Sequence, residues 1–324
     1  MILLTSDLHL TDRTRDDYRF GLFPWLAEQQ LKYNVSNTLI LGDITDSKDN
    51  HSAALVNRLV DGLRLLKPPV IILRGNHDGI NPASPFFKFL DGYNGISFVT
   101  EPRSIGNFFL IPHCSSQSEF DAAASQIQKG QLAFLHQTVE GAVSEAKMRL
   151  SGMNTKALGA AAVVWSGDIH RPQQCGPVTY VGAPYHVRFG DGFEPRCLLY
   201  HNGKQRNIQF PAPRKLVLNV TGPDDIMGAE GDQVKLNVQV NREDLVNWVA
   251  IKNSALDECK NQGLQVFGVS LKIIGPETAP GKTVATKSPA DILNGFCDYE
   301  GIGEELRDAG RELVEEATTG GRKS

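Results

Sequence analysis

Gly75-Asn76-His77-Asp78 is the stretch that decides the fold of this 324-residue sequence. It follows an apolar run at residues 70–73 that has the composition of a buried strand. The amide oxygen of Asn76 can coordinate a metal ion without adding charge, and His77 can donate a proton to a leaving oxygen. Open α/β sheets bind ligands at the carboxyl ends of their strands, so the tetrapeptide predicts a functional loop at such an edge.

Short apolar, β-branched runs recur through the first two hundred residues and alternate with helical patterns. The clearest helical pattern is residues 52–66, in which leucines recur at helical spacing. Strands that alternate with helices indicate an α/β domain. The other strand-like runs are residues 2–5, 38–41, 96–99, 108–111, 132–135, 163–165 and 178–181.

Further polar residues follow these runs. Asp7 and His9 come after the first run, and in an extended segment residues two apart point the same way, so both could reach one metal ion. Gly42 permits a tight turn after the run 38–41, and the two oxygens of the Asp43 carboxylate can bridge two cations.

His136 closes the run 132–135, and Asp168 and His170 follow the run 163–165, again two residues apart. Singly, each of these motifs has an ordinary interpretation as a turn residue or a buried histidine. Jointly, they supply the donors that hard or borderline divalent metals prefer. Two cations about 3.5–4 Å apart would grip a phosphodiester and activate a water for in-line hydrolysis.

The order of these motifs resembles that of the calcineurin-like metallophosphoesterases, whose pattern is Asp-x-His, Gly-Asp-x-x-Asp, Gly-Asn-His-Asp/Glu, His and Gly-His-x-His. The resemblance covers about residues 1–200. It implies an α/β fold with a two-sheet β-sandwich flanked by helices and two metal ions at one end, bridged by Asp43. By the resemblance, one metal is held by Asp7, His9, Asp43 and His170, and the other by Asp43, Asn76, His136 and Asp168.

The resemblance also implies roles for two further residues. His77 would protonate the leaving group or steady the transition state, and Asp46 would orient its imidazole. The last motif departs from the family pattern, because Asp168 stands where the first histidine of Gly-His-x-His is usual. An aspartate is still an oxygen ligand, and its added negative charge favours harder cations, so we expect Mn²⁺, with Mg²⁺ as the alternative.

Within the superfamily, the sequence is most similar to the SbcD-type nuclease subunits of double-strand-break repair complexes, including their phage counterparts. The stretches Tyr-Val-Gly-Ala-Pro at 180–184 and Phe-Gly-Asp at 189–191 carry this resemblance. It implies DNA as the substrate and an SMC-like (SbcC-type) ATPase subunit as a partner. Such nucleases often form homodimers, although no sequence feature here identifies a self-complementary face.

A Pro-Ala-Pro turn at residues 211–213 predicts a domain boundary. We expect a catalytic domain at residues 1–212, a small α+β capping domain at 213–275, and a linker with C-terminal helices at 276–324. Residues 288–317 resemble the helical region that docks the ATPase; an amphipathic helix folded back on the small domain is the alternative.

The net charge of −4 neither selects nor excludes a DNA substrate, so contact with phosphates would need local basic residues. Arg13, Arg171 and Arg188 lie near the first and last metal motifs and are our candidates for substrate binding; solvated loop arginines are the ordinary alternative.

The five cysteines have no metal-binding spacing and are expected to be reduced. The absence of a signal sequence or apolar span predicts a cytoplasmic location without membrane contact.

Competing functions are a small-molecule phosphodiesterase or a protein phosphatase with the same metals. A non-catalytic scaffold that binds DNA or a partner is a third possibility.

Overall fold

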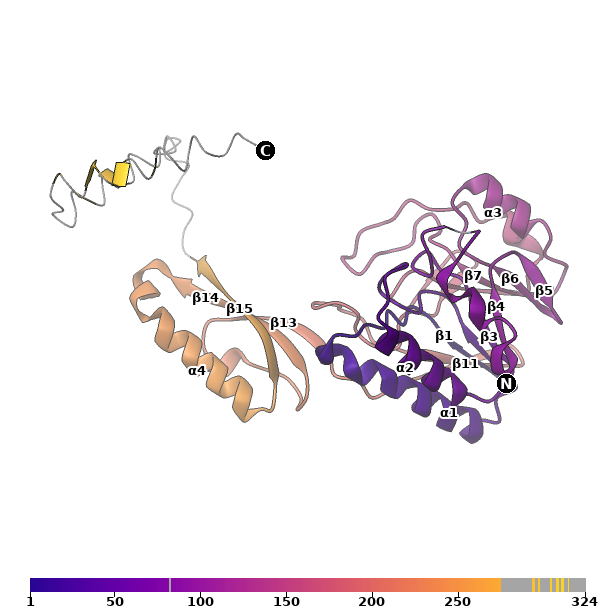
Figure 1. Ribbon diagram of the computed structural model, residues 1–324, viewed down its shortest axis with the longest axis horizontal. Helices are drawn as coiled ribbons and strands as arrows, with labels where there is room; N and C mark the ends of the chain where they lie inside the picture. The colour runs from indigo at the N-terminus through magenta and orange to yellow at the C-terminus, as the bar shows by residue number, and fades with distance from the viewer. Residues whose placement is uncertain are drawn as a thin grey trace. The chain divides into compact units, whose positions relative to one another are not determined.

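The computed structural model describes residues 1–81 and 83–274 and, beyond these, nine separate positions between Leu293 and Val314 (Figure 1). Residues Met1–Lys272 form one compact unit and Ile273–Ser324 a second. Most of the predicted linker and C-terminal helices at 276–324 lie outside the described residues. Among the described residues, no helix is long and apolar enough to cross a membrane.

The first of two six-stranded sheets contains the N-terminal strand at its centre (Figure 1). The strands β1 to β4 are parallel, with Thr5 opposite Ile40 and Ile40 opposite Ile72. Their carboxyl ends therefore meet at one edge. In spatial order the strands are β12 (Lys204–Ile208), β11 (Cys197–His201), β1 (Ile2–Thr5), β2 (Asn37–Ile40), β3 (Val70–Leu73) and β4 (Ile96–Val99).

The second sheet is built in the same way around a parallel centre. The strands β6, β7, β8 and β10 are parallel, and His136 at the end of β7 pairs with Gly167 at the end of β8. In spatial order the strands are β5 (Arg103–Ile105), β6 (Phe108–Ile111), β7 (Leu132–His136), β8 (Val163–Gly167), β10 (Val178–Tyr180) and β9 (Gln173–Cys175).

An apolar layer lies between the two sheets. Leu4 and Leu39 of the first sheet and Phe134 and Trp165 of the second are fully buried in it. The rings of Phe134 and Trp165 stack with their centroids 5.2 Å apart. Because alternate residues of a strand point to opposite faces, Leu3 packs in a separate cluster on the outer face of the first sheet.

Helices cover the outer faces of this sandwich. The helices α1 (Leu22–Lys32) and α2 (Ala53–Arg64) pack on the first sheet, and α3 (Gln117–Ala124) packs on the second. The helix α2 begins where its sequence predicts, because the Ser52 side chain accepts a hydrogen bond of 3.1 Å from the Leu55 amide. Two sheets flanked by helices confirm the predicted fold class.

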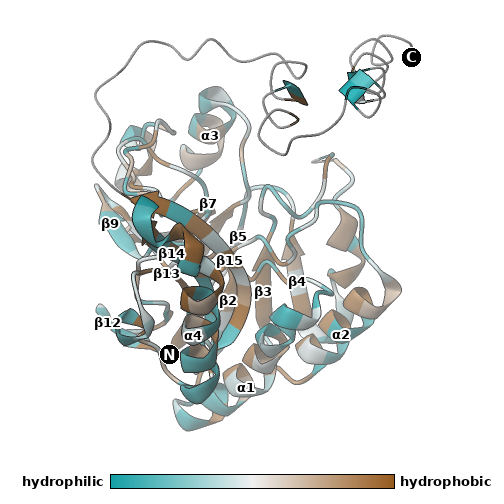
Figure 2. Ribbon diagram, turned by 90° about the vertical axis from the view of Figure 1, so that its left-hand side faces the viewer, coloured by the Kyte–Doolittle hydropathy of each residue, from teal (hydrophilic) through white to brown (hydrophobic). Residues whose placement is uncertain are grey.

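A small three-stranded sheet follows the Pro-Ala-Pro turn, in the order β13 (Lys215–Val220), β14 (Gln233–Asn241) and β15 (Gln265–Ile274). The helix α4 (Trp248–Asn261) packs on it, and a 3₁₀ turn, η6 (Arg242–Asn247), precedes the helix. Figure 2 shows β3 and β4 mainly in hydrophobic colours, whereas α4 carries many hydrophilic residues. The predicted boundary at residues 212–213 stays a prediction.

Candidate metal centre

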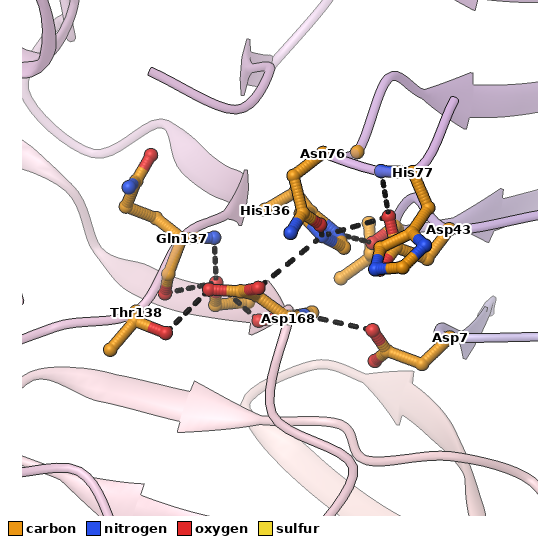
Figure 3. Close-up of polar contacts among 12 residues, drawn as sticks. Asp7, Asp43, Asn76, His77, His136, Gln137, Thr138 and Asp168 are labelled. Atoms are coloured by element: carbon orange, nitrogen blue, oxygen red, sulfur yellow. Dashed lines mark hydrogen bonds and ion pairs between the residues drawn. The ribbon is translucent and has the colours of Figure 1, made fainter. Parts of the chain in front are cut away.

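The loops that follow β1, β2, β3 and β8, together with the end of β7, bring polar side chains to one place (Figure 3). Main-chain contacts join these loops: the Asp7 amide donates to Gly42 O at 3.1 Å, and the His9 amide donates to Asp43 O at 2.9 Å. The Asp168 amide donates to the Asp7 carboxylate at 3.0 Å. Residues far apart in the sequence therefore share one site between the two sheets.

The Asp43 carboxylate stands between two imidazoles. Its Oδ2 lies 3.6 Å from His9 Nε2, and its Oδ1 lies 3.3 Å from His136 Nε2. One oxygen thus faces a histidine that follows the first sheet, and the other faces a histidine of the second sheet. This is the arrangement that a carboxylate bridging two cations requires.

Two groups of buried donors surround this carboxylate. The donor atoms of Asp7, His9 and His170 all lie within 4.8 Å of one another, as do those of Asp7, Asp43 and His136. The Nε2 atoms of His9 and His170 approach to 3.0 Å, and Asp7 Oδ2 is buried without a hydrogen-bond partner. Nitrogen and oxygen donors that converge in this way fit divalent cations.

The amide of Asn76 gives a further test of this fit. Its oxygen lies 3.0 and 3.1 Å from the two carboxylate oxygens of Asp43 and 3.1 Å from His136 Nε2. The amide and carboxylate oxygens are both acceptors and repel one another at such distances, and a cation between them removes the repulsion. Rotation of the amide would instead let its nitrogen donate to the same atoms.

The backbone of the site is left-handed at four positions, with φ values of 55° at Asp7, 40° at His9, 54° at Asp43 and 80° at Asp168. Such values are uncommon outside glycine and cluster at functional sites. The extended geometry that we expected for Asp7 and His9 is therefore wrong, although both side chains still reach the same place.

Two glycines leave room for the donors. A Cβ atom on Gly42, whose φ is +87°, would lie 2.2 Å from His136 Nδ1, and a Cβ atom on Gly75 would lie 2.2 Å from Asp43 Oδ1. Both glycines are therefore required by close approach of a donor, and Gly42 also by its conformation.

The His136 ring ties the two sheets together. Its Nδ1 lies 2.6 Å from the main-chain oxygen of Leu41, which follows β2, and its Nε2 faces the site. A carbonyl oxygen can only accept, so Nδ1 donates to it, and Nε2 is the atom that would bind a metal after losing its proton.

Burial and mutual attraction shift the pKa values of the donors in opposite directions. Burial raises the pKa of Asp7 to about 6. Burial also opposes ionisation of Asp43, but His136 and His9 outweigh it and lower the pKa of that carboxyl. Burial lowers the pKa of His9, whereas Asp43 overcomes burial at His136 and raises its pKa. Metal binding would have to displace a proton from His136 and, below a pH of about 6, also from Asp7.

The two predicted catalytic residues lie beside the donors, with one difference from expectation. Nδ1 of His77 lies 2.8 Å from the main-chain oxygen of Asp46, so the backbone rather than the carboxylate orients the ring. The Asp46 carboxylate instead lies 3.7 Å from His9 Nδ1 and 3.8 Å from Arg13 Nη2. The His77 amide donates to Asp43 Oδ1 at 2.9 Å, which holds the loop against the site.

Asp168 lies on the side of the second sheet. Its Oδ1 is 3.8 Å from His136 Nε2, and its Oδ2 accepts a hydrogen bond of 2.5 Å from the hydroxyl of Thr138. Thr138 lies two residues beyond His136 and carries no motif of its own, so its role was not predicted from the sequence.

Two more carboxylates support the site and were also missed. Asp78 accepts hydrogen bonds from the amides of Asp43 and Ile44, both at 2.9 Å, and so fixes the turn after β2. Glu145 accepts from the His170 amide at 3.0 Å and lies 3.6 Å from Nδ1 of the same residue. Asp78 belongs to the decisive tetrapeptide, whereas no local signal marks Glu145.

The candidate arginines fall into different environments. Arg13 and Arg188 line a cavity of ≈ 430 Å³ beside the site. Arg171 is not among its lining residues, and its Nη1 is buried without a hydrogen-bond partner. Arg19, which also follows the first motif, is buried and donates to the main-chain oxygens of His9 and Val187, so it supports the loop.

The chain is similar to known proteins in sequence and in structure. Residues 1–139 match the family model of the calcineurin-like phosphoesterases. Among solved structures, a dimetal phosphatase from Danio rerio is similar at 13% identity and a TM-score of 0.42, over 65% of this chain and 98% of that one. Pseudomonas putida nuclease MPE is similar at 17% identity and a TM-score of 0.29, over 55% and 66%. No curated protein matches the sequence. The N-terminal part of this chain is thus similar to the calcineurin-like phosphoesterases over residues 1–139, and its two groups of converging donors fit a metal centre of the kind that this family uses.

Proposed function

We propose that this protein is a metal-dependent phosphodiester hydrolase that acts on DNA as a nuclease in recombination or double-strand-break repair. The observation that carries the hydrolase assignment is the position of the Asp43 carboxylate. It lies between His9 and His136, with one oxygen facing each imidazole. A bridging carboxylate with a nitrogen donor on each side suits a pair of divalent cations, for which we propose Mn²⁺, with Mg²⁺ as the alternative.

The metal donors and His77 would have the roles that the family pattern implies. Asp7, His9 and His170 would hold one cation and Asn76, His136 and Asp168 the other, with Asp43 shared. When bound, the cations would neutralise the phosphate and lower the pKa of a water. His77 would give a proton to the leaving oxygen through Nε2, because its Nδ1 is occupied by the main-chain oxygen of Asp46.

A DNA substrate is favoured by the basic cavity beside the site. Arg13 and Arg188 line it, and Arg13 contacts the same Asp46 carboxylate that lies beside His9. A strand with many phosphates would use such a neighbouring basic surface, whereas a cyclic nucleotide has a single phosphate to bind.

The test is hydrolysis of single- and double-stranded DNA with Mn²⁺, in parallel with a cyclic nucleotide and a phosphorylated protein. The nuclease proposal predicts DNA cleavage that is abolished by chelation and by Asp43→Asn, and strongly reduced by His77→Ala. Cleavage of the cyclic nucleotide or the phosphoprotein without cleavage of DNA would instead establish one of the competing enzymes. If the wild type hydrolyses no substrate faster than Asp43→Asn does, the protein is instead a non-catalytic scaffold that binds DNA or a partner.

An SMC-like (SbcC-type) ATPase partner and a homodimer remain proposals that rest on the sequence resemblance. The C-terminal segment expected to dock the ATPase lies mostly outside the described residues. Addition of a candidate ATPase to the same DNA assay tests the partner, and light scattering of the purified chain tests the dimer.

A further inference from the structure

The cavity beside the candidate metal centre has strongly basic walls. Six basic side chains line it against two carboxylates, although the whole chain has a net charge of −4. The lining comes from the loops after β1 and β2, from residues 187–189, and from β13 and β14 of the small sheet. The basic residues are Arg13, Arg15, Arg19, Arg188, Lys215 and Lys235.

One wall of the cavity holds a buried carboxylate that is outnumbered by cations. Asp16 is 1% exposed, and its Oδ1 lies 2.6 Å from Lys215 Nζ and 3.2 Å from Arg19 Nη2. Arg15 Nε lies 3.9 Å from the other oxygen. A single carboxylate can neutralise only one of these three charges. Positive charge therefore remains in a poorly solvated place, where a bound anion would compensate it.

Two other cations of the lining are exposed. Within the part of the chain that the structure describes, neither Arg188 nor Lys235 forms an ion pair with a carboxylate. Nζ of Lys235 lies 4.8 Å from the ring centroid of Phe189, which also lines the cavity. These side chains are free to contact an anion without breaking an existing ion pair.

Asp46 lines the cavity and also contacts one of the metal donors. Arg13 Nη2 lies 3.8 Å from Asp46 Oδ2, and Asp46 Oδ1 lies 3.7 Å from His9 Nδ1. A ligand that fills the cavity therefore ends next to the donors of the first cation.

We propose that this cavity binds a phosphate of a nucleic-acid strand other than the phosphate that is hydrolysed. The proposal rests on the proposed function and deepens it. A strand carries phosphates at regular spacing, so one can lie at the metals while another lies in the cavity, whereas a simple ester fills only the first place. Because Lys215 and Lys235 belong to the small sheet, that sheet takes part in selecting polymers over single esters.

The experiment compares kcat/KM for a short oligonucleotide with kcat/KM for bis(p-nitrophenyl) phosphate, using the full chain with Mn²⁺. The variants are Lys235→Ala and Lys235→Glu, and the matched control is Lys272→Ala, an exposed lysine of the same sheet outside the cavity. We expect the ratio of the two kcat/KM values to fall on the order of tenfold for Lys235→Glu, and less for Lys235→Ala. The slope of log KM for the oligonucleotide against log salt should fall by about 1 for Lys235→Ala. The control should keep both ratio and slope.

Binding of a fluorescent oligonucleotide, measured by anisotropy at several salt concentrations, separates this inference from the proposed function. If the wild type cleaves no DNA but binding still falls on the order of tenfold in Lys235→Glu, the cavity stands and the nuclease assignment fails. If the wild type cleaves DNA and Lys235→Glu changes neither binding nor the ratio, the cavity proposal is overturned and the nuclease assignment stands.

Inorganic phosphate distinguishes a strand phosphate from a free one. We expect millimolar phosphate to raise the melting temperature of the wild type less than the oligonucleotide does at equal phosphate content. Inorganic phosphate could raise the melting temperature of the wild type but not of Lys235→Glu, while oligonucleotide binding is the same in both. That result would show a site for a free anion and overturn the assignment to a strand.

Discussion

The hydroxyl of Thr138 donates a 2.5 Å hydrogen bond to Oδ2 of Asp168, the carboxylate that stands where the family pattern has a histidine. The bond occupies one oxygen and leaves Oδ1 on the side of His136. A partner of this kind fixes the direction of a ligand and tunes its affinity for a metal. The substitution in the family motif is thus accompanied by a residue that positions it.

Removal of the charge at Asp168 should weaken metal binding. Asp168→Asn keeps an oxygen but loses the negative charge, so we expect the affinity for Mn²⁺ to fall by about 10- to 100-fold, and Thr138→Val to cause a smaller loss in the same direction. Asp168→His should favour Zn²⁺ relative to Mn²⁺. Calorimetric titration with each metal measures these changes, and an Mn²⁺ affinity equal to that of the wild type in Asp168→Asn would exclude this residue as a ligand.

Metal affinity should decrease as the pH falls through about 6. Burial raises the pKa of Asp7 to about 6 in the metal-free protein, so below that pH the carboxyl carries a proton that must leave before it can bind a cation. Above that pH, Asp7 is ionised and contributes no further pH dependence. Titrations in buffers of different ionisation enthalpy should show proton release growing between pH 7 and pH 5, and Asp7→Asn should remove this part of the release.

A methyl group at Gly75 should damage the site more than the fold. The new Cβ would lie 2.2 Å from Asp43 Oδ1, so the bridging carboxylate or the loop must move. We expect Gly75→Ala to lower kcat by at least about 100-fold, since a displacement of about 1 Å costs this much. Gly159→Ala is the control, because a Cβ there meets no atom within 4 Å. Rates and melting curves of both variants, compared with the wild type, check the prediction.

The carboxylate of Asp16 should stabilise the fold at neutral pH but not in acid. Burial opposes its ionisation, but Arg19 and Lys215 outweigh burial and lower its pKa. Its contribution is therefore present above the unfolded-state pKa of about 3.9 and is lost as the pH falls through the lower folded value. Asp16→Asn leaves two buried cations without a counter-charge and should lower the free energy of unfolding by about 3–5 kcal/mol at pH 7.

Urea unfolding at pH 7 and at pH 3 measures this difference. The gap between wild type and Asp16→Asn should narrow at the lower pH. A gap that is constant between the two pH values would mean that the carboxylate contributes by shape alone.

The sequence predicted the parts of the site that depend on single strand ends. Apolar runs followed by Asp7, Asp43 or His136 indicated strands and their carboxyl edges, and parallel pairing brings those edges together. The apolar composition of each run and the polar residue that follows it are local properties, so they can be read without knowledge of the rest of the chain.

The supporting residues could not be predicted in this way, because their roles depend on contacts across the fold. Glu145 meets His170 only through the path of the loop between β7 and β8. Arg19 and Arg188 look equivalent in the sequence, yet Arg19 is 2% exposed beside Asp16 while Arg188 is exposed in the cavity. The left-handed backbone at Asp7 and His9 likewise follows from main-chain bonds to a neighbouring loop.

The hydrogen bond from His136 Nδ1 to Leu41 O makes the spacing between the sheets part of the reaction chemistry. A slip of one sheet against the other would pull this imidazole away from Asp43 before the apolar layer lost its cohesion. Phe134→Ala, a substitution in that layer, should therefore abolish turnover at temperatures where circular dichroism still shows a folded sandwich. The packing between the two sheets therefore controls the distance between His136 and Asp43.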